Sequence, residues 1–290
     1  MSQKTLFIGL GVMGYHMAGH LSKQVLTSVF NRTSSKSKAW LNEFKGANFE
    51  TLDTQLQDFN FIITCIGNDQ DLREIYLSEN GLVNRSQKGT ILIDHTTASA
   101  SIAREISVKA HEKGLYFIDA PVSGGEQGAI NGQLTVMCGG EVSAFEKAKP
   151  IISNYAKAVT LLGKNGAGQL TKMSNQLAVA GVVQGLAEAI HFAEQAGLDC
   201  RQVIEVISKG AAQSWQMDNR SDTMIQGEYE HGFAVDLMRK DLDICLSEAR
   251  KLEAKLPATA LIDQFYADIQ DMGGNRWDTS SLLERLRPKK

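Results

Sequence analysis

One lysine lies on an apolar, small-residue segment that we expect to form a single long helix over residues 169–195. Lys172 shares one face of that helix with Asn175, Gln176 and Val179, at spacings of three and four residues. Such a lysine costs free energy unless it lines a site or pairs with an acid. Burial lowers a lysine pKa toward neutrality, which suits proton transfer to a substrate oxygen. The alternative is an ammonium that reaches solvent, and the helix position alone leaves both open.

A serine and two glycines follow an apolar run at 116–120 that we expect to be a buried strand. Ser123 offers a hydroxyl, and Gly124 and Gly125 offer amides with no side chain in front of them. This combination suits a small carboxylate or a carbonyl oxygen. The same residues also fit an ordinary connecting turn.

A third cluster combines an aromatic ring with charges, at Phe233, Asp236, Lys240 and Asp241. Asp236 and Lys240 are four residues apart on an expected helix, the spacing of a surface ion pair. Lys240 could instead reach a cofactor or a substrate carboxylate, and the spacing does not decide between the two.

Residues 5–33 follow the order strand, glycine-rich turn, helix, strand, which is the order of a dinucleotide-binding unit. Gly9 permits the tight turn, Gly11 lets the backbone approach phosphates, and Gly14 lets helix and strand pack closely. The start of the helix supplies amide donors and a positive dipole end. We therefore expect a cofactor pyrophosphate at Gly9, Gly11, Val12, Met13 and Gly14.

The tip of the second strand carries a guanidinium and hydroxyls at Asn31, Arg32 and Thr33. NAD sites usually place an acid there to accept from the ribose 2′-hydroxyl. No Asp or Glu occurs between Gly14 and Glu43. Arginine and hydroxyl donors suit a 2′-phosphate, so the sequence favours NADPH as the cofactor. NAD is the alternative cofactor, and the segment could also be a solvated polar loop that binds nothing.

The first half of the chain alternates short apolar runs with helix-like segments, whereas the second half has helix signals only. The apolar runs lie at 61–66, 91–94, 116–120, 133–138 and 159–162. We expect an α/β protein with an N-terminal Rossmann-type dinucleotide-binding domain over residues 1–164 and a mostly parallel sheet. The long helix joins it to an all-α C-terminal domain over residues 165–290, with further helices near 200–210, 233–255 and 259–273.

Composition narrows the class of protein. The chain has 290 residues, a net charge of −3, and no dense basic tract, which argues against nucleic-acid and membrane-surface partners. The four cysteines form no CxxC pair and the six histidines show no metal-ligand spacing, so we expect free thiols and no metal. The first strand begins almost at the N-terminus, and no uninterrupted apolar stretch approaches transmembrane length. We expect a cytoplasmic protein.

The chain resembles the β-hydroxyacid dehydrogenases, a family that includes 3-hydroxyisobutyrate dehydrogenases, tartronate semialdehyde reductases and glyoxylate/succinic semialdehyde reductases. The resemblance covers essentially the whole chain. The matching motifs are the glycine turn at 9–14, Asp119-Ala-Pro-Val-Ser-Gly-Gly at 119–125, Gly-Ala-Gly-Gln-Leu-Thr-Lys-Met-Ser-Asn-Gln at 166–176, and Phe233 with Lys-Asp-Leu at 240–242. The second and third motifs are specific to the family.

The resemblance implies roles for individual residues. Lys172 matches the general acid/base, and Asn175 matches a residue that orients substrate. Other positions match contacts to the substrate carboxylate (Ser123, Gly124, Gly125), the nicotinamide side of the cofactor (Ile66, Thr97, Lys240) and the lining of the substrate site (Phe233, Asp241). One departure is Ile66-Gly67-Asn68, where many relatives have a proline; its loss removes a restraint on the nicotinamide loop.

The main hypothesis is an NADPH-dependent reductase that converts a small carboxylate-bearing aldehyde, such as glyoxylate, succinic semialdehyde or tartronate semialdehyde, to its hydroxy acid. The first alternative is an NAD(P)-dependent dehydrogenase of 3-hydroxyisobutyrate or another 3-hydroxy acid. The second is a non-catalytic dinucleotide-sensing module, which need not keep Lys172, Asn175 and Ser123. The apolar long helix also predicts a homodimer or homotetramer.

Overall fold

The structure, a computed structural model, describes residues 3–52 and 56–287. The chain divides into two compact units, Met1–Lys172 and Met173–Lys290. The division falls inside the long helix α8 (Ala167–Gln195), which the sequence predicts over 169–195.

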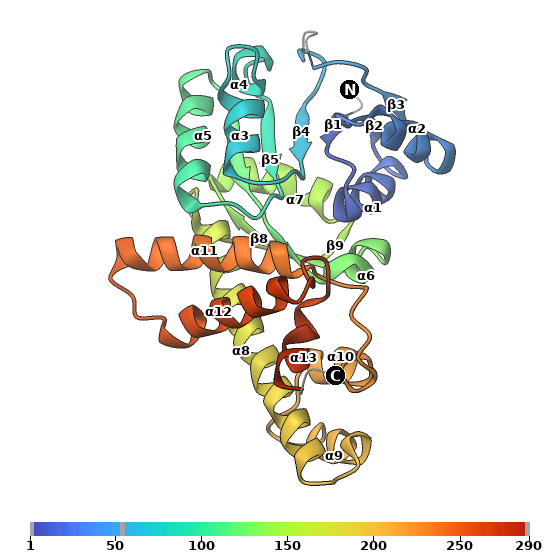
Figure 1. The fold of residues 1–290 in the computed structure, drawn as a ribbon. Helices are drawn as coiled ribbons and strands as arrows, with labels where there is room; N and C mark the ends of the chain where they lie inside the picture. Colours follow the sequence, from blue (N-terminus) through green and yellow to red (C-terminus); the bar gives the residue numbers. More distant parts are fainter. Residues whose placement is uncertain (1–2, 53–55, 288–290) are drawn as a thin grey trace. The chain divides into compact units, whose positions relative to one another are not determined.

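The first unit is built on one nine-stranded sheet, as expected for a Rossmann-type domain (Figure 1). Strand β1 runs parallel to β2 on one side and to β4 on the other. The parallel strands, in spatial order, are β3 (Ala47–Asn48), β2 (Leu26–Phe30), β1 (Lys4–Ile8), β4 (Phe61–Thr64), β5 (Ile91–Asp94) and β6 (Tyr116–Asp119). This is the strand order of a doubly wound dinucleotide-binding sheet.

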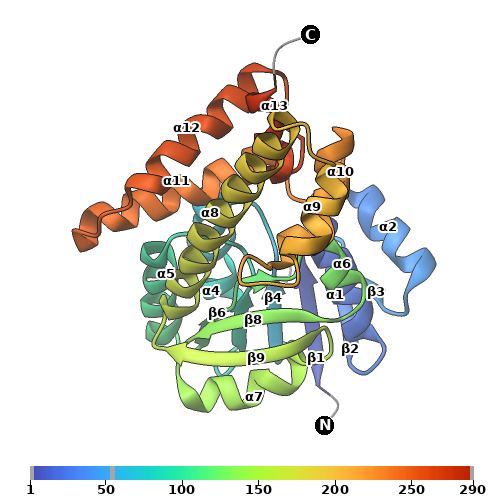
Figure 2. The ribbon, with the colours of Figure 1, turned by 90° about the horizontal axis from the view of Figure 1, so that it is seen from below.

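The other end of the sheet is mixed in direction. Strand β8 (Leu134–Gly139) pairs antiparallel with β6 and with the short β7 (Val122–Ser123). Strand β9 (Ala156–Gly163) pairs parallel with β8 along its length (Figure 2). The prediction of a mostly parallel sheet is therefore confirmed, and the antiparallel exceptions are the pairings of β8 with β6 and with β7.

Helices cover both faces of this sheet and create two separate cores. In β1, Phe7 belongs to one core while Leu6 and Ile8 belong to the other, because successive side chains of a strand point to opposite faces. The helices on the Phe7 face are α1 (Val12–Ser22), α2 (Ser34–Glu43), α6 (Gly125–Ile130) and α7 (Val142–Ile152). Those on the other face are α3 (Asp69–Leu77), α4 (Leu82–Arg85) and α5 (Ala100–Glu112), where α3 and α5 lie side by side (Figure 1).

The second unit is helical, and its described residues contain no strand longer than the isolated bridge between Ala234 and Asp278. Its core gathers side chains such as Val183, Leu242 and Tyr266. The predicted helices are present as α9 (Cys200–Ile207), α11 (Val235–Leu252) and α12 (Pro257–Asp271), and α11 packs beside α12. The sequence did not indicate α10 (Trp215–Gln226), η1 (Thr279–Ser281) or α13 (Leu282–Leu286).

Helix α8 bears on the expectation about membranes. Its 29 residues are long and apolar enough to cross a membrane by length and composition, although polar residues such as Lys172 and Asn175 interrupt its apolar run. Core helices of soluble proteins share this property, and 44% of its most apolar window is buried. Ala180, Val183 and Leu186 pack into the core of the second unit, whereas Val182 and Phe192 are exposed.

A buried carboxyl group organises the carboxyl end of β5. Asp94 Oδ1 accepts hydrogen bonds from the Thr64 hydroxyl at 2.7 Å and from the Thr96 N–H at 3.1 Å. Burial raises the pKa of Asp94 to about 7, against the opposing effect of these hydrogen bonds. The next residue, His95, bonds the Ala120 carbonyl and the Tyr155 hydroxyl, and burial lowers its pKa to about 4, so its ring is neutral.

We expect the thermal unfolding midpoint to fall as the pH rises from about 6.5 to about 8, and Asp94→Asn to remove most of this fall. The native carboxyl titrates near pH 7, whereas the unfolded one has lost its proton at its ordinary pKa of 3.8. The native state therefore binds more protons in this window, so its stability is lost as the pH rises. The unfolded state protonates His95 near its ordinary pKa of 6.5, whereas the native ring is neutral, so His95 reduces this slope at the lower end of the window and has little effect above about pH 7.5.

Calorimetry across this window checks the prediction. Asp58→Asn is the control, because Asp58 is an exposed carboxylate paired with Lys4 and should keep the wild-type slope. A midpoint that stays constant or rises with pH in the wild type would contradict the role of Asp94.

Candidate active site

The residues predicted to bind the cofactor lie where parallel strands end. The chain winds from β1 to β2 and β3 in one direction and from β4 to β6 in the other, so the order reverses between β1 and β4. Ligands of open parallel sheets bind outside the carboxyl ends of the strands at such a point. The glycine turn follows β1, Ile66 follows β4 and Thr97 follows β5.

The glycine turn has the geometry that a pyrophosphate site requires. Gly9 has a φ of 99°, and a Cβ there would lie 2.2 Å from the carbonyl oxygen of Cys65. A Cβ on Gly14 would lie 2.0 Å from the Gly9 oxygen, whereas one on Gly11 would meet no atom within 4 Å. Helix α1 starts after Gly11 with no side-chain cap and no acid in its first turn. The open space and the bare helix start fit a dinucleotide pyrophosphate, with the exposed Val12 at its side.

Asn31 joins the glycine turn to the tip of β2. Its Oδ1 accepts from the Leu10 N–H at 2.9 Å, and its Nδ2 donates to the Thr33 carbonyl at 3.1 Å. Both hydrogen bonds are to backbone groups, so the Asn31 side chain fixes the conformation of the two segments that were predicted to contact the cofactor.

The segment after β2 presents cationic and amide donors. Arg32 and Thr33 are exposed, and Thr33 occupies the N-cap of α2 without a side-chain cap bond. The first turn of α2 contains no acid. A helix start of this kind favours an anion, and the Arg32 guanidinium stands next to it in the chain.

The loop that follows β4 is held by hydrogen bonds to side chains. The Ile66 N–H donates to Thr96 Oγ1 at 3.0 Å. Asn68 caps helix α3 by accepting from the amides of Gln70 and Asp71. The Ser99 N–H donates to Asp69 at 2.8 Å, which ties the segment after β5 to the same region.

The predicted carboxylate contact lies at a tight corner of the sheet. Ser123 ends β7 and is half-buried, and Gly124 and Gly125 are exposed. Gly124 has a φ of 126° and Gly125 a φ of 62°, conformations that favour glycine. A Cβ on Gly125 would meet no atom within 4 Å, so the space beside its exposed Cα is open.

Lys172 is positioned by a buried carboxylate to which the sequence assigned no role. Asp119, the last residue of β6, accepts from the N–H of Gly166 at 2.8 Å and from that of Gln169 at 3.1 Å. Both amides belong to the start of α8. Burial raises the pKa of Asp119 to about 6, although these amide hydrogen bonds oppose the shift. Lys172 lies on the next turn of the same helix and is itself buried.

In the second unit, hydrogen bonds connect Asn175 to Asp241. Asp241 Oδ2 accepts from Gln176 Nε2 at 2.7 Å, and Gln176 Oε1 accepts from Asn175 Nδ2 at 2.8 Å. A carboxylate only accepts, so Gln176 must turn its NH₂ toward Asp241 and its oxygen toward Asn175. This chain fixes the direction of the Asn175 amide. Asp241 is buried and also pairs with Lys240 at 3.3 Å.

Phe233 and Asp236 are placed by loops near the end of the chain. The Phe233 N–H donates to Asp278 Oδ2 at 2.8 Å, and its carbonyl accepts from the Thr279 N–H at 2.9 Å. Asp236 accepts from the side chains of Gln270 and Asn275. Lys240 forms an ion pair with its neighbour Asp241.

The structure thus groups the predicted residues within each unit. The first unit brings the glycine turn, Ile66 and Thr97 to neighbouring strand ends, and places Lys172 on the helix that Asp119 caps. The second unit brings Asn175, Lys240 and Asp241 together. Sequence reasoning assigned no role to Asp119, Gln169 and Gln176, although all three lie inside the quoted motifs.

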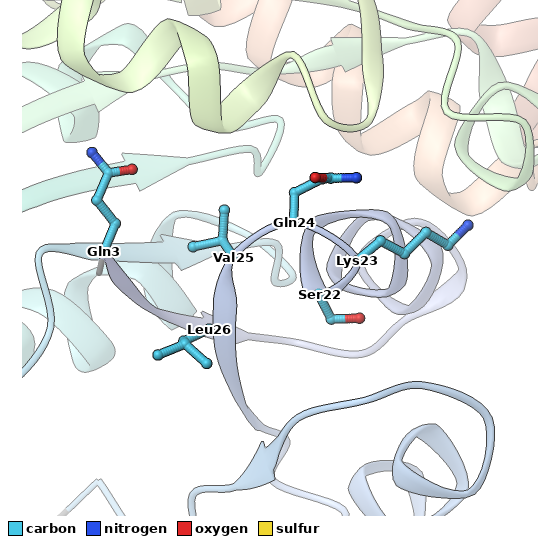
Figure 3. A pocket seen from close by; sticks show the side chains of 6 residues that line it. All are labelled: Gln3, Ser22, Lys23, Gln24, Val25 and Leu26. Atoms are coloured by element: carbon cyan, nitrogen blue, oxygen red, sulfur yellow. The ribbon is translucent and has the colours of Figure 1, made fainter. Parts of the chain in front are cut away.

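A cavity of about 390 Å³ lies elsewhere in the first unit (Figure 3). Gln3 and Leu26 line it at the amino ends of β1 and β2, together with the turn at 22–25. That edge is opposite to the strand ends described above, and Lys23 is the one charged group among its described lining. The described residues also contain no group of three or more His, Cys, Asp or Glu that could hold a metal ion.

Two family models match consecutive parts of the chain. Residues 4–163 match the family model of the NAD binding domain of 6-phosphogluconate dehydrogenase. Residues 166–286 match the model described as NAD-binding of NADP-dependent 3-hydroxyisobutyrate dehydrogenase. Together the two matches extend over nearly the whole chain.

Individual relatives match this chain over nearly all of its length. A 2-hydroxy-3-oxopropionate reductase of Escherichia coli is 32% identical over 97% of this chain and 98% of its own length. A probable 3-hydroxyisobutyrate dehydrogenase-like protein of Arabidopsis thaliana is 37% identical over 97% of this chain and 84% of its own. The solved Mycobacterium tuberculosis 3-hydroxyisobutyrate dehydrogenase with L-serine superposes with a TM-score of 0.90 at 26% identity, covering 99% of this chain and 100% of that one.

Substitutions at two glycines distinguish an effect on cofactor binding from an effect on the stability of the fold. Gly11→Ala should keep the wild-type melting temperature and weaken dinucleotide binding by about tenfold or more, because its methyl enters the space that fits the pyrophosphate. Gly14→Ala should lower the melting temperature, because its Cβ clashes with the Gly9 carbonyl. Calorimetry and cofactor titration measure both. Equal binding by wild type and Gly11→Ala would place the pyrophosphate elsewhere.

Proposed function

Because the chain belongs to the β-hydroxyacid dehydrogenase family, we propose that it is an NADPH-dependent reductase of a small aldehyde that carries a carboxylate. Glyoxylate, succinic semialdehyde and tartronate semialdehyde are the substrates to test. The observation that carries the proposal is Lys172, a buried amine on the helix that Asp119 caps at the sheet edge. The E. coli reductase, similar over its full length, supports the direction of the reaction.

In this proposal, each group has one task. Bound NADPH supplies a hydride to the carbonyl carbon, which becomes the carbinol carbon of the hydroxy acid. Lys172 gives its proton to the carbonyl oxygen, and its positive charge stabilises the developing alkoxide. Ser123 and the amides of Gly124 and Gly125 hold the substrate carboxylate, and Asn175 orients the substrate. The products are the hydroxy acid and NADP⁺.

The preference for NADPH rests on the tip of β2. Arg32 and the uncapped start of α2 offer a guanidinium and helix amides, and the first turn of α2 has no acid to repel a phosphate. A 2′-phosphate satisfies such donors better than a 2′-hydroxyl does.

A second candidate is the reverse reaction, oxidation of 3-hydroxyisobutyrate or another 3-hydroxy acid. The similarity to the M. tuberculosis dehydrogenase favours it, because the L-serine in that structure is itself a 3-hydroxy carboxylate. The same residues serve both directions, with Lys172 accepting the proton in the oxidation.

We also propose that the protein acts as a homodimer or homotetramer in the cytoplasm. In the second unit, Phe192 is 73% exposed and Val206 is 69% exposed. Exposed large apolar side chains of this kind support an association surface. The four free cysteines are consistent with a reducing compartment.

Lys172→Ala should lower kcat by about 10²–10⁴-fold and leave NADPH binding within about threefold, because the variant lacks the proton donor but keeps the glycine turn. Steady-state oxidation of NADPH against the three aldehydes measures the loss. Lys164→Ala serves as a surface control, because Lys164 is an exposed lysine three residues before the start of α8. A near-wild-type rate in Lys172→Ala would remove this mechanism.

Arg32→Ala should weaken NADPH at least about tenfold and NADH less than about twofold, because only NADPH carries the 2′-phosphate. Fluorescence titration of both cofactors gives the comparison. Lys38→Ala is the matched control, since Lys38 is an exposed cation one turn further along α2. Equal weakening of both cofactors in Arg32→Ala would contradict a phosphate contact.

A further inference from the structure

The segment from Thr96 to Ala98 leaves the carboxyl end of β5 and carries Thr97, one of the residues predicted on the nicotinamide side. The Thr96 N–H donates to Asp94, and the Thr96 hydroxyl accepts from the Ile66 N–H. These bonds fix the first residue of the segment to the sheet. The backbone groups on either side of Thr97, the Thr96 carbonyl and the Ala98 N–H, need partners of their own because both are buried.

One side chain satisfies both groups. Gln169 Nε2 donates to the Thr96 carbonyl at 2.7 Å, and Gln169 Oε1 accepts from the Ala98 N–H at 3.1 Å. The side chain is 1% exposed. A primary amide is the group that can donate and accept side by side in this way, so Gln169 clasps the peptide groups that flank Thr97.

The backbone of the same residue is anchored to the neighbouring strand. The Gln169 N–H donates to Asp119 Oδ2 at 3.1 Å, at the end of β6. The preceding residue is pressed against strand ends, because a Cβ on Gly168 would lie 2.4 Å from the Met137 carbonyl and 2.6 Å from that of Asp119. The first turn of α8 therefore has no room to slide along the sheet.

Gln169 thus connects the segment bearing Thr97 with the helix bearing Lys172. Residues three apart share a helix face, about 4.5 Å apart along the axis. Resting on the proposed function, we propose that Gln169 is a positioning residue that fixes the Thr97 segment and Lys172 in one register. The hydride acceptor carbon and the protonated oxygen belong to one carbonyl group, so the segment that would contact the nicotinamide and the helix that carries Lys172 must keep a constant spacing. A displacement of about 1 Å in such an arrangement can cost about 10²-fold in rate.

The first test needs neither cofactor nor substrate. Gln169→Met keeps the length and much of the shape of the side chain but removes both hydrogen bonds. Hydrogen exchange followed by mass spectrometry should show faster exchange in the segment 95–99, because the Ala98 N–H loses its acceptor. Gln184→Met is the matched control: Gln184 is a buried glutamine of the same helix, bonded to Glu188. It should leave exchange in 95–99 unchanged.

The second test is kinetic. Gln169→Met should lower kcat by about 10–10²-fold, while the KM for the aldehyde and the Kd for NADPH stay within about threefold. The primary isotope effect on kcat with 4-deuterated NADPH should rise, because a mispositioned hydride transfer becomes more fully rate-limiting. A purely structural role would leave this isotope effect unchanged. Gln169→Asn, whose shorter amide can reach one of the two groups, should give an intermediate kcat and serves if the methionine variant does not fold.

The outcomes separate the two proposals. A wild type that turns over none of the aldehydes or hydroxy acids would count against the proposed function. Unchanged exchange at 95–99 in the Gln169 variants would overturn the clasp. Faster exchange with kcat within twofold of the wild type would overturn the positioning role and leave the reductase function standing.

Discussion

The hydrogen bonds from Gly166 and Gln169 to the Asp119 carboxylate are the interaction on which the rest of the site depends. They place a negative charge at the positive end of α8, where amides lack partners inside the helix. Burial opposes this charge and raises the pKa of Asp119 to about 6, so the carboxylate is mostly ionised at neutral pH. The last residue of a core strand thus fixes where the longest helix begins, and with it the position of Lys172.

Close packing around that carboxylate requires glycines, because a side chain at these positions would clash with it. A Cβ on Gly139 would lie 2.7 Å from Asp119 Oδ1, and one on Gly168 would lie 2.8 Å from Oδ2. The glycine turn follows the same rule, since Gly14 can approach Gly9 only without a side chain. Where strands, helix start and turn converge, backbone approaches backbone, and the glycines of the motifs serve this approach as much as they serve a ligand.

The fold was predictable from the sequence because its signals are local. The apolar runs gave the parallel strands, and the small-residue segment gave α8 to within two residues of its observed start. Helix α10 also has local signals at its two ends: Ser214 caps its first turn and Gly227 ends it in the left-handed conformation. The antiparallel direction of β8 has no such signal, because it depends on which strand becomes its neighbour.

The supporting residues of the site could not be read from the sequence, for a related reason. Gln169 meets Thr96 across 73 positions, and Gln176 meets Asp241 across 65. Both are ordinary glutamines on a helix until their partners are known. In each unit the partners are groups of fixed polarity, a backbone carbonyl with an N–H in the first and a carboxylate in the second. A primary amide placed against such groups can lie in only one direction, so Gln169 holds the peptide groups that flank Thr97, and Gln176 fixes the direction of the Asn175 amide.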